Sequence, residues 1–132
     1  MALLTSIPAV RQVATDRPDL YAFDLVGGIS PADVENFYGL LEAAYTLHPT
    51  IDVLVRVVDQ EGVDPADASR QTLDAGKKHA AKHVRRCALV GNTRAMPEIK
   101  VFFGPSVEVR QFAGSEEAAA WQWIEGAPVE AA

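Results

Sequence analysis

The stretch IDVLVRVVD at residues 51–59 decides the fold, because it is nearly continuous in β-branched side chains. Such a run is typical of a central parallel strand that is covered on both faces. A second stretch of the same kind, VRRCALVG, occupies residues 84–91. We therefore expect these two segments to lie side by side in the middle of a helix-covered sheet.

Helix signals separate and follow these strands. The segments SPAD (30–33) and DPAD (64–67) each place a capping side chain before a proline at the first helical position. They predict one helix that ends at His48-Pro49 and a second one over residues 64–83, whose inner face consists mostly of alanine and leaves thin packing. A third helix is expected within 93–103, and a final helix is expected to start at the cap Ser115.

The first part of the chain predicts a hairpin. The runs IPAVRQVATD (7–16) and YAFDLVGG (21–28) flank a turn at Arg17-Pro18-Asp19, and Gly27-Gly28 is expected to end the second strand. SVEVRQF (106–112) predicts the last strand. The order ββαβαβαβα favours an α/β fold: a single, mostly parallel five-stranded sheet flanked by about four helices, with the first strand antiparallel or at an edge.

Size and charge limit the classes of protein. The 132 residues, 48% of them hydrophobic, suit one domain, expected at 1–126, with 127–132 as a flexible tail. A formal net charge of −6 disfavours general nucleic-acid binding. No run is long enough to span a bilayer. The lone Cys87 and the start MALLTSIPAV, which lacks a signal-peptide pattern, lead us to expect a cytoplasmic protein.

The segment RCALVGNTRAMPEIKVFFGPSVEVRQFAGSEEAAAWQWIEG, residues 86–126, resembles the C-terminal half of the SpoIIAA-like family, which is similar to STAS and SEC14-type domains. The strand that reaches Gly91 and the acidic helix with Ala120-Trp121 carry the resemblance, and Gly76 and His79 have counterparts upstream. The resemblance implies a compact α/β fold, roles in regulation, partner binding or apolar-ligand binding, and no catalytic residue.

STAS-type antagonists of anti-sigma factors carry a phosphorylatable serine where the second long helix begins. The corresponding segment here, residues 59–65, has no hydroxyl side chain, and Ser69 lies a turn further on without the characteristic neighbours. We therefore do not expect a phosphorylation switch of that type.

The carboxyl ends of the parallel strands are the expected place for a small-molecule site. An acidic loop and a glycine turn that leads into a helix would meet there and could bind a ligand. The alternative is that the acidic residues form an ordinary solvated loop and that the residues after the glycine only cap the helix. The candidate ligand-binding residues are Asp59, Gly62, Asp64, Gly91, Asn92 and Thr93.

A basic stretch is the sharpest local anomaly, because residues 75–97 contain no Asp or Glu in an acidic chain. Its cations either contact an acidic partner or complement the negative end of a helix. This basic patch consists of Lys77, Lys78, Lys82, Arg85 and Arg86. His79 and His83 have the spacing of zinc ligands, but no third ligand is apparent, so no metal is expected.

The predicted third helix is more apolar than one buried face requires. Its surplus would line an apolar pocket, form an interface or simply belong to the core. The residues are Met96, Ile99, Phe102 and Phe103.

These observations favour a non-catalytic, cytoplasmic, STAS-like regulatory or protein-interaction module that uses no cofactor and binds a protein partner or a second copy of itself. The alternative is a carrier or sensor that binds a small apolar or lipid-like ligand between the helices 64–83 and 93–103. An enzyme that uses the acidic loop after Asp59 ranks lowest, since no nucleophile, base and oxyanion donor can be assembled from identifiable motifs.

Overall fold

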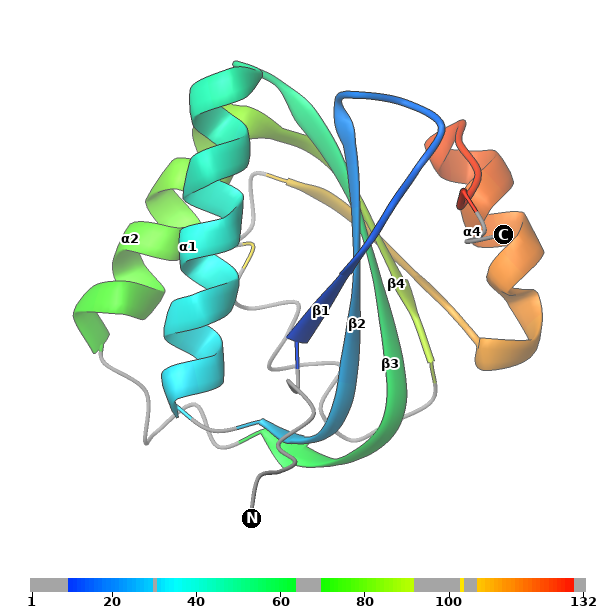
Figure 1. Ribbon diagram of the computed structural model, residues 1–132, viewed down its shortest axis with the longest axis horizontal. Helices are drawn as coiled ribbons and strands as arrows, with labels where there is room; N and C mark the ends of the chain where they lie inside the picture. Colours follow the sequence, from blue (N-terminus) through cyan, green and yellow to red (C-terminus); the bar gives the residue numbers. More distant parts are fainter. Residues whose placement is uncertain (1–9, 30, 64–69, 92–102, 104–106, 130–132) are drawn as a thin grey trace, which may run out of the picture.

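The computed structural model of the chain describes residues 10–29, 31–63, 70–91, 103 and 107–129 (Figure 1). Strands and helices alternate along most of this length. The elements are β1 (Val10–Val13), β2 (Leu20–Ile29), α1 (Pro31–Leu47), β3 (Ile51–Val63), α2 (Arg70–His83), β4 (Val84–Val90), β5 (Glu108–Phe112), a 3-10 turn (Gly114–Glu116) and α4 (Glu117–Ile124).

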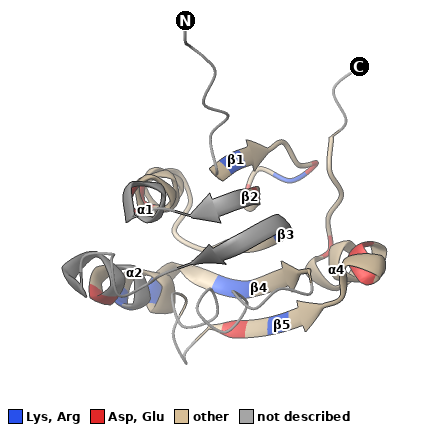
Figure 2. Ribbon diagram, turned by 90° about the horizontal axis from the view of Figure 1, so that it is seen from below, with Lys and Arg blue, Asp and Glu red and all other residues tan. Residues whose placement is uncertain are grey.

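The five strands form one sheet in the order β1-β2-β3-β4-β5 (Figure 2). β1 pairs antiparallel with β2, which confirms the hairpin, and the other three pairings are parallel. β3 lies in the middle and pairs with β4, for example Leu54 opposite Ala88, as the two β-branched runs predict. The expected α/β fold with a mostly parallel five-stranded sheet is therefore confirmed.

Helices cover both faces of the sheet. Because strand order follows chain order, right-handed crossovers place α1 and α2 on the same face, and α4 packs on the opposite face (Figures 1 and 2). Alternate residues of β3 serve the two sides: Val53 and Val55 belong to the core under α1 and α2, whereas Leu54 belongs to the core under α4.

The larger core lies under α1 and α2. Phe23 of β2 contacts Phe37 of α1 edge to face, with ring centroids 5.0 Å apart. The smaller core lies under α4, where Trp121 is only 6% exposed and confirms its predicted anchoring role. Trp121 also donates a hydrogen bond from Nε1 to the carboxylate of Glu117, at 3.0 Å.

The strands extend further than predicted. β2 runs through the two glycines to Ile29, and β3 runs on to Val63, since the two strands stay paired as Gly28 opposite Gly62 after a register shift that follows Val26. The shift leaves two extra residues on β3, and such an irregularity need not end a ladder. The expectation that Gly27-Gly28 ends the strand is therefore wrong.

The helices differ from the prediction in count and in one boundary. Three α-helices are described instead of about four; the predicted helix at 93–103 lies outside the described residues except for Phe103, and so do residues 64–69 of the second one. Ser115 is not the cap of the last helix, because it lies inside the 3-10 turn and α4 begins two residues later. The carboxylate of Glu116 instead accepts a hydrogen bond from the amide of Ala113, at 2.9 Å.

The segment after α4 returns to the hairpin. The amide of Val129 donates to the carbonyl of Ala14, and the amide of Asp16 donates to the carbonyl of Ala127, at 2.9 and 3.0 Å. Residues 127–129, which the sequence assigns to a flexible tail, are thus hydrogen-bonded to residues 14–16 of the hairpin. Residues 130–132 lie outside the described part. In the segments that the structure describes, no helix has both the length and the apolar character needed to cross a membrane.

Candidate functional site

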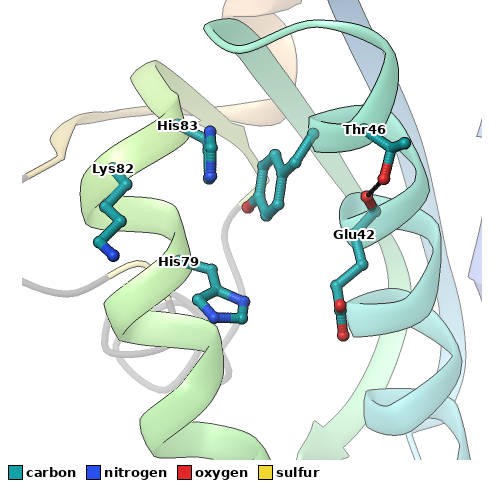
Figure 3. A pocket seen from close by; sticks show the side chains of 6 residues that line it. Glu42, Thr46, His79, Lys82 and His83 are labelled. Carbon is teal, nitrogen blue, oxygen red and sulfur yellow. Dashed lines mark hydrogen bonds between the residues drawn. The ribbon is translucent and has the colours of Figure 1, made fainter.

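A groove opens between α1 and α2, with a volume of about 280 Å³. Side chains of the two helices face each other across it (Figure 3). Residues spaced three or four apart share one face of a helix, so one face of each helix supplies a wall. The lining residues are Glu42, Tyr45 and Thr46 from α1 and His79, Lys82 and His83 from α2.

Aromatic stacking fixes the walls of the groove. Tyr45 stacks on His83 with ring centroids 4.6 Å apart and an interplanar angle of 19°. One turn earlier, Tyr38 stacks on His79 with centroids 6.0 Å apart, and the Tyr38 hydroxyl lies 2.9 Å from His79 Nδ1. Each histidine is therefore held in place by a tyrosine of the neighbouring helix.

The proton positions in the groove follow from these contacts. His83 Nδ1 lies 2.8 Å from the carbonyl oxygen of Pro49. A carbonyl can only accept, so Nδ1 carries a proton. Burial raises the pKa of Tyr45, and burial together with the nearby Glu42 carboxylate raises the pKa of Tyr38, so both hydroxyls stay protonated.

The groove thus presents both acceptors and donors of hydrogen bonds. The Glu42 carboxylate accepts hydrogen bonds, whereas the Lys82 ammonium and the Tyr45 hydroxyl donate them. Among the described residues, no three His, Cys, Asp or Glu side chains come together as ligands for a metal ion. This arrangement can bind polar and charged side chains by hydrogen bonds and ion pairs.

A second polar cluster lies on the opposite face of the sheet, around Asp52. The side chain of Asp52 has no exposed surface, and its Oδ2 accepts hydrogen bonds from Arg17 Nη2 at 2.9 Å and from Arg86 Nη2 at 3.3 Å. Arg85 donates to both carboxylate oxygens. Burial by itself would raise the pKa of Asp52, but the hydrogen bonds from the three guanidinium groups outweigh it and hold this pKa below its ordinary value.

This cluster attaches the end of α4 to the sheet. Arg17 Nη1 donates to the carbonyl of Ile124 and Arg86 Nη1 donates to the carbonyl of Trp123, each at 2.8 Å. Carbonyls in the last turn of a helix lack partners within the helix, and cations there are favourable. Because these contacts satisfy the helix end, we assign the cluster a structural role.

The predicted ligand site at the strand ends is only partly described. Asp59 and Gly62 do not lie in a loop as expected, because the ladder between β2 and β3 continues past both. Gly91 follows β4 with φ of 140°, and a Cβ there would lie 2.9 Å from the carbonyl oxygen of Val57, so packing accounts for this glycine. The other three candidates, Asp64, Asn92 and Thr93, lie outside the described residues.

The predicted basic patch is divided between two faces of the molecule. Lys78 and Lys82 are exposed on α2, whereas Arg85 and Arg86 turn toward Asp52 on the α4 side. β4 pairs Ile51 with Val84 but Asp52 with Arg86, so Arg85 is the extra residue of a bulge, and both arginines reach Asp52. The side chain of Lys77 lies outside the described part, and a binding role of these basic residues stays a prediction.

The apolar set of the predicted third helix is described at one position. Phe103 is fully buried in the larger core, 6.2 Å from Phe37 between ring centroids. This position matches the ordinary-core alternative for that residue. Met96, Ile99 and Phe102 lie outside the described residues, so their part in a pocket or an interface stays a prediction.

The sequence does not predict the groove lining or the polar cluster around Asp52. In the sequence, Glu42 belongs to the polar side of a predicted helix, and no local pattern links it to His83. For Asp52 a signal exists: an acidic residue within a strand expected to be covered on both faces needs a buried cationic partner.

Together, the sheet order and the helices on both faces define the class: a single-sheet α/β domain of STAS-like architecture. A family model described as SpoIIAA-like matches residues 20–125. The chain belongs to the SpoIIAA-like family, as the resemblance of residues 86–126 predicts.

The fold has a counterpart among solved structures. The chain is similar to an uncharacterised protein of the DUF3478 family with a SpoIIAA-like fold from Shewanella loihica PV-4. The two share 22% sequence identity with a TM-score of 0.64, over 93% of this chain and 99% of the other. A search of curated proteins finds no match to the chain.

Proposed function

We propose that this chain is a non-catalytic, cytoplasmic module that binds a protein partner through the groove between α1 and α2. The observation that carries the proposal is the presence of opposite charges on the two walls of the groove, Glu42 on α1 and Lys82 on α2, beside the stacked rings of Tyr45 and His83. Tyrosine is enriched in protein interfaces because its rigid ring gives contact area and its hydroxyl gives a directed hydrogen bond.

The shape of the groove supports a protein partner. Pockets for drug-sized ligands have volumes of about 300–1,000 Å³ and bury most of the ligand. The groove is slightly smaller, at about 280 Å³, and it lies open at the surface between two helices (Figure 3). A hollow of this kind suits one or two side chains that project from a larger surface.

The surroundings of the reactive groups favour binding over catalysis. Burial raises the pKa of the Cys87 thiol, which has no exposed surface inside the sheet. The Thr46 hydroxyl donates to the carbonyl of Glu42 within its own helix, at 3.1 Å. His79 and His83 hold Tyr38 and a backbone carbonyl rather than a nucleophile.

The alternative function is the carrier or sensor of a small apolar ligand between the helices 64–83 and 93–103. One observation favours it: Ala80 is the one described side chain of α2 that is fully buried, and alanine fills little space against the sheet. Native mass spectrometry of the purified protein separates the two functions. A retained apolar ligand would favour the carrier.

Affinity capture with matched variants tests the interaction module. Lys82→Glu reverses a charge that lines the groove, and Arg11→Glu makes the same change at an exposed position of β1 away from the groove. We expect a partner that is retained by the wild type and by Arg11→Glu but not by Lys82→Glu. Equal capture by all three proteins would contradict the proposal.

A folding control accompanies this experiment. Lys82 and Arg11 are both exposed, and no ion pair of the described residues involves them. Exposed charges contribute little to stability, so the circular dichroism spectrum of the double variant should match that of the wild type.

A further inference from the structure

The two helices that form the groove carry opposite charge. α1 contains three acidic residues and no basic residue, which gives a formal charge of −3. α2 contains four basic residues and one acidic residue, which gives +3. The acids of α1 are Asp33, Glu35 and Glu42, and the charged residues of α2 are Arg70, Lys77, Lys78, Lys82 and Asp74.

Neither Glu42 nor Lys82, the charges that line the groove, forms an ion pair with another described residue. The ion pairs of the described side chains are centred on Asp52 and Arg56, and none joins α1 to α2. Glu42, Lys78 and Lys82 are all exposed. The face formed by α1 and α2 therefore shows an acidic half beside a basic half.

We propose that a second copy of this chain covers the α1/α2 face, with a two-fold axis that runs along the groove. This inference rests on the proposed function, because it names the partner. The two helices lie side by side and run in the same direction (Figure 1). A rotation about an axis parallel to both places α1 of each copy over α2 of the other, so each acidic helix meets a basic one.

The charge pattern selects this axis over the other one available in the plane of the interface. A two-fold axis perpendicular to the helices would place α1 over α1 and α2 over α2, with like charges opposite one another, which disfavours association. A two-fold interface uses the same patch twice, so every favourable contact occurs in duplicate. Acid on one helix and base on the other is the pattern that such an interface requires.

The position of the charges along the helices agrees with the proposal. Glu42 and Lys82 line the same groove and therefore lie at a similar height. A rotation about an axis along the groove preserves that height, so Glu42 of one protomer lies opposite Lys82 of its partner, and the reverse. The exposed residues Gly39, Ala43 and Ala81 have little or no side chain, which allows the helices to approach closely.

An exposed apolar side chain would also be covered. Leu47, at the end of α1, is 72% exposed, the largest value among the exposed large hydrophobic residues of the described part. Its burial against a second copy would add a hydrophobic contribution to the ion pairs. Since exposed ion pairs are screened by salt, the dimer should weaken as ionic strength rises.

Two single variants and their mixture test the dimer. Glu42→Lys and Lys82→Glu each replace two attractive contacts per dimer with two repulsive ones. We expect each variant alone to raise the dimer Kd by about tenfold or more in low-salt sedimentation velocity. In an equimolar mixture, the heterodimer restores both attractions, so its Kd should return to near the wild-type value.

The mixture separates contacts between chains from effects within one chain, because each variant keeps its own altered groove in the mixture. Glu108→Lys, on the exposed part of β5, serves as the charge-matched control and should leave association unchanged. A wild type that stays monomeric, or a mixture that associates no better than its components, would overturn the proposal. If captured partners still depend on Lys82 in that case, the proposed function stands and only the second copy is ruled out.

Discussion

Replacing Asp52 with asparagine should cost about 3 kcal/mol of unfolding free energy. Breaking a buried ion pair typically costs about 3–5 kcal/mol because a charge is left without its partner. Here Arg85 and Arg17 are 53% and 23% exposed in their side chains, so water can replace the lost carboxylate. Arg86 is only 16% exposed, and its Nε is buried without a hydrogen-bond partner among the described residues, so it bears most of the penalty. These exposures place the cost at the low end of the range.

Urea denaturation followed by circular dichroism measures this change. A loss of about 3 kcal/mol is a large share of the stability of a small domain and should lower the Tm by roughly 10 °C. Asp19→Asn is the control, because that carboxylate also pairs with Arg17 but its side chain is 41% exposed. It should cost less than about 1 kcal/mol. Equal costs for the two variants would refute the role that we assign to burial.

The pH dependence of the same variant gives a second check. The pKa of Asp52 in the folded protein lies below its ordinary value, so its contribution is fully present above that ordinary value and is lost as the pH falls through the folded pKa. The ordinary pKa of aspartate is about 3.9. The stability difference between wild type and Asp52→Asn should therefore stay constant from pH 7 to about pH 5 and shrink below about pH 4. A difference that persists in full at pH 2 would contradict this account.

Two further predictions concern backbone geometry. Gly91→Ala should destabilise the fold by about 2 kcal/mol in urea denaturation, since φ is 140° and the new Cβ would press on the carbonyl oxygen of Val57; a neutral result would mean that this turn can move. Glu125 ends α4 at φ of 62°, a conformation that favours glycine, and its carboxylate pairs with Arg86 at 3.0 Å while its side chain is 72% exposed. Glu125→Gly should be more stable than Glu125→Ala by about 1 kcal/mol, because only glycine removes the backbone strain; the reverse order would show that the strain is absent.

The central architecture could be predicted because its signals are local. A β-branched run such as 51–59 identifies a strand within a few residues, and the proline of SPAD fixes the start of α1 at Pro31. The extent of β2 could not be predicted in this way, because glycines usually end strands. The continuing partner strand keeps Gly28 paired here, and that partner lies more than 30 positions further along the chain.

The polar clusters could not be predicted because they join distant segments. Arg17 donates to the carbonyl of Ile124 across a separation of 107 residues. The basic run at 77–86 reads as one patch in the sequence, but α2 and β4 turn its side chains toward different surfaces. The groove likewise depends on how α1 and α2 lie beside each other, which the spacing of His79 and His83 on one helix does not reveal.

The agreement between strand order and chain order has a consequence for synthesis. When a strand leaves the ribosome, the strand that it pairs with in the sheet has already been synthesised. The sheet can therefore grow from β1 to β5 in the order of synthesis, without waiting for distant partners. The contacts of residues 124–129 with residues 14–17 are the exception, because they join the last described segment to the first. We expect these contacts between the two ends of the described chain to form last and to stabilise a sheet that has already assembled.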